Sequence, residues 1–144
     1  MYCIDELIPH SGKMSLLDRV VAYGEDWLTT SVTICSNSMF CENNAVPALV
    51  GIEYMAQTIA AFAGKNDKIN NIEISIGLLI GARKYTTNVT HFPVGTTLQI
   101  NAQQIYLEEQ GLGVFKCKIT GDSGILVEAN LNVYHPEDIE SIIK

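Results

Sequence analysis

One carboxylate and one amide stand out in a largely apolar stretch of this sequence. Between residues 45 and 64 polar side chains are few, and two of them, Glu53 and Gln57, are four residues apart. In a helix this spacing puts both side chains on one face, one turn apart. A carboxylate in an apolar interior is costly unless it is paired, neutral or lining a polar cavity. The pair therefore predicts acid–base chemistry inside the fold, with a structural carboxylate tied to a backbone amide or to Arg83 as the alternative.

The segment that must position this pair is predicted to be the one long helix of the chain. Pro47 suits the first helical turn, and Gly64 suits the position just past the end. Apolar or small side chains cover nearly every face between them, namely Leu49, Val50, Ile52, Tyr54, Met55, Ala56, Ile59, Ala60, Phe62 and Ala63. A helix that is apolar all round is a buried helix. It is not a membrane span, because Glu53 lies near its centre.

Strand-like segments lie on both sides of this helix. They cover residues 17–23 and 27–34 before it, and 72–89, 97–108, 113–119 and 125–134 after it. Gly-rich turns separate most neighbours, and the Asn-rich segment 35–45 is predicted to be a loop. An antiparallel sheet wrapped around one long central helix satisfies this pattern, because only its concave face can bury such a helix. We therefore predict an α+β fold and a single domain over residues 1–144.

The composition argues against several other classes of protein. Nine Lys and Arg against sixteen Asp and Glu give a net charge of −7, which disfavours nucleic acid as a partner. Cys3, Cys35, Cys41 and Cys117 form no CxxC pair and no spacing typical of a tetrahedral metal site, so we expect reduced thiols and no metal. No secretory signal opens the chain, and we expect a cytoplasmic protein without an integral membrane segment.

Three segments resemble the 3-hydroxyacyl-acyl-carrier-protein dehydratases, a family with the hot-dog fold. They are VPALVGIEYMAQ at residues 46–57, LIPH with MSLLDRV at residues 7–10 and 14–20, and ARKY with PVG at residues 82–85 and 93–95. In that family a proline opens the helix, the catalytic carboxylate follows six residues later, and a glutamine lies one turn beyond. The sequence is most similar to the dehydratase-like branch of aryl polyene synthesis. The resemblance implies a hot-dog fold.

The resemblance also implies a reaction, the elimination of water from a 3-hydroxyacyl thioester to give the trans-2-enoyl thioester. The substrate is carried on the phosphopantetheine arm of an acyl carrier protein or on coenzyme A, and the protein needs no cofactor of its own. Glu53 would protonate the leaving hydroxyl, and Gln57 would position Glu53. The amides of Ala48 and Leu49, without acceptors at the helix start, are predicted to bind the enolate-like oxygen.

The sequence departs from the family at the catalytic histidine. Typical members carry a His-Phe-Pro-Gly motif before the helix, at a position that falls near Met39, and this loop contains no histidine. His91 follows the helix and is predicted to be an exposed turn residue, while His135 marks the end of the last strand. His10 remains as the predicted base, because an unperturbed imidazole has a pKa of about 6.5 and can accept a proton at neutral pH. The alternative is that His10 packs its loop under the sheet.

Partners and competing functions stay open on the sequence alone. Arg83 and Lys84 are candidates for a basic patch that binds the pantetheine phosphate or the carrier, unless they are solvated edge charges. Two other functions compete with dehydration: a hot-dog thioesterase in which Glu53 activates water, and a non-catalytic subunit that stabilises an active paralogue. Hot-dog sheets leave an edge strand that pairs with a second subunit, so we expect a homodimer or a heterodimer with a paralogous dehydratase.

Overall fold

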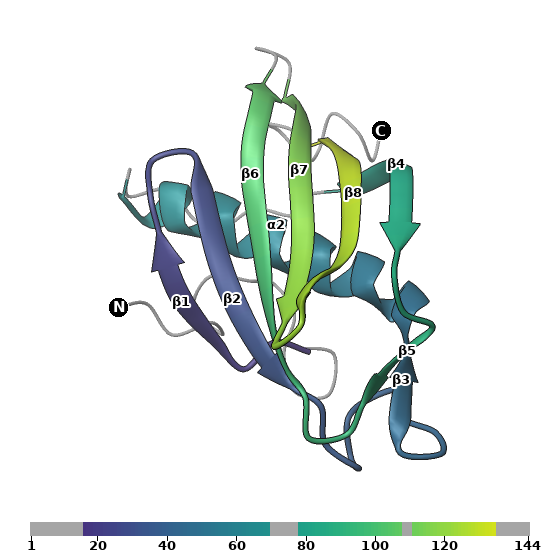
Figure 1. Ribbon diagram of the computed structural model, residues 1–144. Helices are drawn as coiled ribbons and strands as arrows, with labels where there is room; N and C mark the ends of the chain where they lie inside the picture. Colours follow the sequence, from purple (N-terminus) through teal and green to yellow (C-terminus); the bar gives the residue numbers. More distant parts are fainter. Residues whose placement is uncertain (1–15, 70–77, 108–110, 135–144) are drawn as a thin grey trace, which may run out of the picture.

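A computed structural model describes residues 16–69, 78–107 and 111–134 (Figure 1). Its main feature is a six-stranded antiparallel sheet with strand order β1-β2-β6-β7-β8-β4. The strands are β1 (Arg19–Tyr23), β2 (Trp27–Thr33), β4 (Leu78–Thr87), β6 (Thr97–Leu107), β7 (Leu112–Gly121) and β8 (Gly124–Tyr134). The predicted hairpin of residues 17–34 and the later strands are confirmed where the structure describes them.

A single long helix crosses one face of this sheet (Figure 1). It is α2 (Gly51–Ile69), preceded by the one-turn 3-10 helix η2 (Ala48–Val50). The strands alternate accordingly, since Phe115 and Cys117 of β7 are buried toward α2 while Lys116 and Lys118 are exposed on the other face. The predicted α+β arrangement of a sheet around one helix is confirmed.

The helix is held to the sheet by apolar and polar contacts. No residue from 51 to 66 is exposed, which agrees with the burial predicted from its apolar surface. Phe62 packs edge-on against Phe115, with ring centroids 5.6 Å apart. The buried Thr58 hydroxyl donates to the Tyr54 carbonyl at 2.8 Å and therefore accepts a hydrogen bond from the Thr30 hydroxyl, 2.8 Å away on β2. The position of the helix is therefore fixed along its length, which in turn fixes the side chains at its start.

Both predicted helix ends are displaced in the structure. Pro47 is the last residue of the short strand β3 (Ala45–Pro47), and the α-helix begins only at Gly51. At the other end the helix runs past Gly64 to Ile69. Lys65 explains the extension, because its Nζ donates to the Gly24 carbonyl at 2.7 Å and lies over the Phe62 ring. These tertiary contacts outweigh the local preference of glycine for a helix end.

A second, two-stranded sheet at the helix start was not predicted. It pairs β3 with β5 (His91–Pro93) in antiparallel register, with Val46 opposite Phe92 and Pro47 opposite His91. Val46 and Phe92 are both fully buried, and their burial explains why such short strands pair. His91 therefore lies in a strand and not in a turn, which corrects that prediction, although its side chain is exposed as expected. No helix in the described residues is long and apolar enough to cross a membrane.

Candidate functional site

Glu53 and Gln57 are joined by a hydrogen bond on α2. The Gln57 Nε2 donates to Glu53 Oε1 at 3.1 Å, and the Gln57 Oε1 accepts the backbone N–H of Leu16 at 2.9 Å. Because the Leu16 amide can only donate, it fixes which end of the Gln57 amide faces the carboxylate. Gln57 is fully buried and Glu53 is half-buried. This geometry is the one that the predicted positioning role of Gln57 requires.

The prediction that the Ala48 amide binds an oxyanion is wrong for this structure. The Ala48 N–H donates to the Thr90 carbonyl at 2.9 Å, so it is not available to a ligand. The reason is the β3–β5 pairing, which brings the chain before β5 alongside the helix start. The Ala48 carbonyl is also engaged, since it accepts the Tyr85 hydroxyl at 2.5 Å. The predicted role of the neighbouring Leu49 amide stays a prediction.

The basic residues predicted to bind the carrier lie apart from Glu53. Arg83 is opposite Asn130 in the register of β4 and β8, and Asn130 is opposite Lys116 of β7, so all three share the face turned away from α2. Lys84 is the next residue, exposed at an irregularity of β4 with a φ of 54°. Any contact of Arg83 with a carrier would therefore be made on the outer face.

Only one of the three candidate histidines, His91, lies in the described residues. His10 and His135 lie outside the described residues. His91 is exposed on β5, with its Nδ1 3.1 Å from the Thr90 hydroxyl. No group of three His, Cys, Asp or Glu side chains that could hold a metal ion occurs in the part of the chain that is described.

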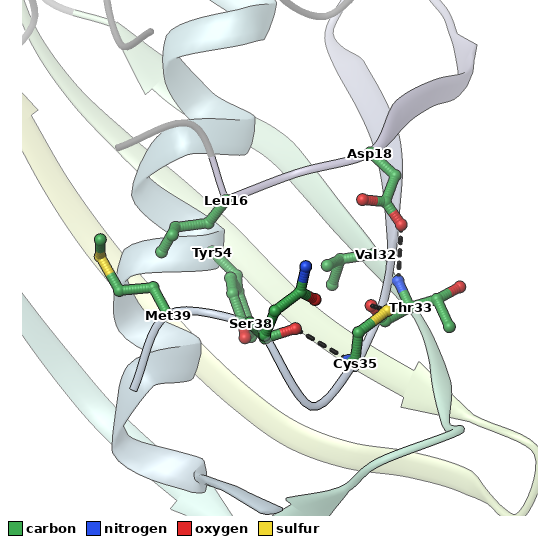
Figure 2. A pocket seen from close by; sticks show the side chains of 9 residues that line it. Leu16, Asp18, Val32, Thr33, Cys35, Ser38, Met39 and Tyr54 are labelled. Atoms are coloured by element: carbon green, nitrogen blue, oxygen red, sulfur yellow. Dashed lines mark hydrogen bonds between the residues drawn. The ribbon is translucent and has the colours of Figure 1, made fainter. Parts of the chain in front are cut away.

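A pocket of about 600 Å³ opens beside the helix, between the ends of β1 and β2 and the loop before β3 (Figure 2). Its described lining consists of Leu16, Asp18, Val32, Thr33, Cys35, Asn37, Ser38, Met39 and Tyr54. Met39, near which the family resemblance places a histidine, is thus part of this wall. Glu53 is not in the described lining; its chain neighbour Tyr54 is, and so is Leu16, whose backbone N–H is bonded to Gln57.

Tyr54 forms the buried end of this pocket, a role that the sequence did not reveal. The side chain is 2% exposed, and its hydroxyl has no hydrogen-bond partner among the described residues. Burial, followed by the nearby Asp18 carboxylate and the Cys41 thiol, raises the pKa of Tyr54 to about 12. The phenol therefore stays neutral and can donate a hydrogen bond. In the sequence Tyr54 reads as one more apolar residue of the helix, and the signal that was missed is a hydroxyl next to Glu53.

Asp18 is the second pocket residue that sequence reasoning missed. Its Oδ2 accepts the Thr33 backbone N–H at 2.8 Å, across the β1–β2 hairpin (Figure 2). On the opposite wall, the Ser38 hydroxyl accepts the Cys35 N–H at 2.8 Å and shapes the loop. These bonds give the polar side of the pocket a fixed geometry.

Removing the Tyr54 hydroxyl is expected to make the protein more resistant to alkali. The pKa of this phenol is 10.0 when unperturbed and about 12 in the folded chain, so its ionisation does not affect stability below pH 10, and the free energy of unfolding falls as the pH rises from 10 toward 12, because the unfolded chain releases this proton first. At about 1.4 kcal/mol per pKa unit, the loss approaches roughly 2 to 3 kcal/mol. Urea unfolding at about pH 9 and pH 11.5 should show a smaller loss in Tyr54→Phe than in the wild type.

The matched control is Tyr106→Phe, because Tyr106 is exposed on β6. This variant should lose as much stability between the two pH values as the wild type. Burial also raises the pKa of the Cys117 thiol to about 12, but this contribution is common to all three proteins. Equal alkaline losses in Tyr54→Phe and the wild type would show that the phenol ionises as readily in the folded chain as in the unfolded one.

Comparisons with known proteins agree on one family of folds. The family described as ApeP-like, ApeP dehydratase, matches residues 2–144. A chain of the dehydratase heterocomplex ApeI:P from Xenorhabdus doucetiae superposes with a TM-score of 0.91 at 28% identity, covering 99% of this chain and 97% of that one. A search of curated protein sequences gave no match.

More distant structures share only the fold. A hypothetical thioesterase protein with coenzyme A from Streptococcus pneumoniae TIGR4 has a TM-score of 0.63 at 9% identity, covering 81% of this chain and 84% of that chain. The PaaI protein of E. coli, from the phenylacetic acid degradation operon, has a TM-score of 0.62 at 11% identity, covering 80% of each chain. Together these structures confirm the predicted hot-dog fold.

Proposed function

This chain belongs to the ApeP-like dehydratase family, and we propose on that premise that it removes water from a 3-hydroxyacyl thioester in aryl polyene synthesis. The observation that carries the proposal is the carboxylate of Glu53, held by the buried amide of Gln57. A half-buried carboxylate with a dedicated amide partner is suited to proton transfer at a fixed position.

The proposed reaction needs one base and one acid. The base takes the proton from the carbon next to the thioester carbonyl, and the electron pair of that C–H bond forms the new double bond. The hydroxyl at the next carbon leaves as water after it receives a proton from Glu53. We propose His10 as the base and the Leu49 amide as a donor to the carbonyl oxygen. A carrier protein as the thioester donor and a cytoplasmic location are parts of the same proposal.

A second candidate function is that of a partner subunit in a dehydratase heterocomplex. The favouring observation is the similarity to a chain of the ApeI:P heterocomplex, together with Met39 in the pocket where the resemblance predicts a histidine. Among the described residues, the outer strands β1 and β4 of the main sheet each have one side without a neighbouring strand, and either edge can extend the sheet into a second subunit. In this case the paralogue supplies the catalytic groups and this chain completes the site.

The deciding experiment offers the protein an acyl carrier protein loaded with a 3-hydroxyacyl chain and measures the product by mass spectrometry. The chain is assayed alone, with a paralogous dehydratase whose own catalytic histidine has been replaced, and with the intact paralogue. Loss of one water in either of the first two samples is the expected result, because this chain must then supply the chemistry. Release of the free acid would identify a thioesterase. Turnover only with an intact paralogue would identify the partner subunit.

A further inference from the structure

We propose that the Tyr54 hydroxyl donates a hydrogen bond to the substrate, and that the pocket beside it takes an uncharged part of the thioester that carries an oxygen acceptor. The inference rests on the proposed function only in naming a thioester as the ligand. It adds a specificity-determining residue to the site, since neither Tyr54 nor this pocket has a role in the mechanism above.

The first observation is the buried, unpartnered donor. Tyr54 projects from α2 between Leu16 and Ser38 (Figure 2), and its hydroxyl meets no acceptor in the described part of the chain. Buried polar groups in native proteins are nearly always hydrogen-bonded, and exceptions need a reason. A ligand acceptor that enters the pocket would satisfy this hydroxyl, whereas phenylalanine would serve equally well if only packing mattered.

The second observation is the charge of the lining. The described wall contains one carboxylate, Asp18, and no Lys, Arg or His. Thr33 holds this carboxylate in place, so it cannot swing away from an incoming group without losing a hydrogen bond. An anionic ligand group would be repelled, and a hydrocarbon group alone would leave Tyr54 unsatisfied. The described wall therefore favours neutral oxygen acceptors, with Val32 and Met39 as apolar contacts for the carbon chain.

The third observation is the connection to Glu53. Leu16 lines the pocket, and its backbone N–H is bonded to Gln57, which in turn holds Glu53. Glu53 and the pocket are thus one residue apart along this chain of hydrogen bonds, and we infer that a thioester bound at Glu53 extends into the pocket with an adjoining part. Two parts of an acyl thioester have the required chemistry, the amide carbonyls of the pantetheine arm and an oxygen atom on the acyl chain.

The test measures binding of unreactive thioether analogues to the full chain by calorimetry. The analogues are S-methylpantetheine, pantetheine joined through sulfur to a hydrocarbon tail, and the same tail ending in a hydroxyl or in a carboxylate. Tyr54→Phe should weaken binding by about 3- to 10-fold wherever the acceptor is present. Weakening of all four would place the acceptor on the pantetheine arm, and weakening of the hydroxyl tail alone would place it on the acyl chain. Unchanged affinity for every analogue would overturn the proposal.

Matched variants separate this effect from misfolding. Tyr106→Phe removes an exposed phenol and should change no affinity. Asp18→Asn should strengthen binding of the carboxylate tail relative to the hydroxyl tail, because it removes the repulsion. Tyr54→Phe should also unfold at no lower urea concentration than the wild type, since its hydroxyl has no partner to lose in the described structure; a clear loss of stability would count against the proposal.

The binding assay also keeps the two proposals apart. If Tyr54→Phe weakens binding but no sample eliminates water, dehydration fails and the donor role of Tyr54 stands. If water is eliminated while the affinities of Tyr54→Phe are unchanged, dehydration stands and the donor role fails.

Discussion

Glu53→Gln is expected to lower the rate of water elimination by about 100- to 10,000-fold, the range typical of removing a general acid–base group. The substitution keeps the shape of the side chain, and its amide oxygen can still accept the hydrogen bond from Gln57. The loss therefore reflects the missing acidic proton and not a rearranged helix. The measurement is a single-turnover assay with a loaded carrier protein, read by mass spectrometry, because it separates chemistry from binding and product release.

Glu128→Gln provides the matched control for this experiment. Glu128 is exposed on β8, and its register partner is Lys118 on the face away from α2. Its replacement changes the net charge in the same way and should leave the rate within about twofold of the wild type. If the Glu53→Gln protein is as active as this control, Glu53 does not take part in the reaction. The proton to the leaving hydroxyl must then come from another group, such as one of the partner subunit.

The Glu53–Gln57 pair could be predicted from sequence because both residues belong to one helix. A spacing of four residues determines their relative position once the helix forms, and the apolar residues around them indicate burial. The structure agrees, with 3.1 Å between the two side chains. It also adds the Leu16 amide, which lies 41 residues away in sequence and could not be inferred from a local pattern.

The prediction that the Ala48 amide binds an oxyanion failed because this amide, like the Leu16 amide, is engaged in a long-range contact. The free amides at a helix start are a local feature, but whether another strand occupies them depends on long-range pairing. Here the acceptor is the Thr90 carbonyl, brought in by two strands of only three residues each. Strands this short carry too little periodicity to be recognised in a sequence. The pocket beside Tyr54 was missed likewise, because its walls come from three separate segments.

The main strands were predictable since their burial alternates along the chain. In β6, for example, Leu98, Ile100 and Ala102 are fully buried while Gln99 and Gln103 are exposed. The helix end was not predictable from Gly64, because the contact between Lys65 and the Gly24 carbonyl joins two distant segments. Local patterns thus determined which elements form, and tertiary contacts determined where they end.

Phe62→Ala is expected to destabilise the protein by about 3 to 5 kcal/mol, which is typical for truncation of a buried aromatic side chain. Phe62 is 2% exposed, its ring packs edge-on against Phe115 of the sheet, and the Lys65 Nζ lies 4.6 Å from its centre. Alanine would leave a cavity between α2 and β7 and would remove the ring that faces the ammonium group. The measurement is the free energy of unfolding in urea, compared at equal m-values.

Phe40→Ala is the control, because the same truncation is made on a side chain that is 57% exposed in the loop before the helix. It should change the free energy of unfolding by no more than about 0.5 kcal/mol. If Phe62→Ala does not fold, Phe62→Leu should still show an intermediate loss, since leucine refills part of the cavity. Equal stability of the Phe62 and Phe40 variants would mean that this end of α2 is not held by the sheet. The fixed placement of Glu53 would then depend on the helix start alone.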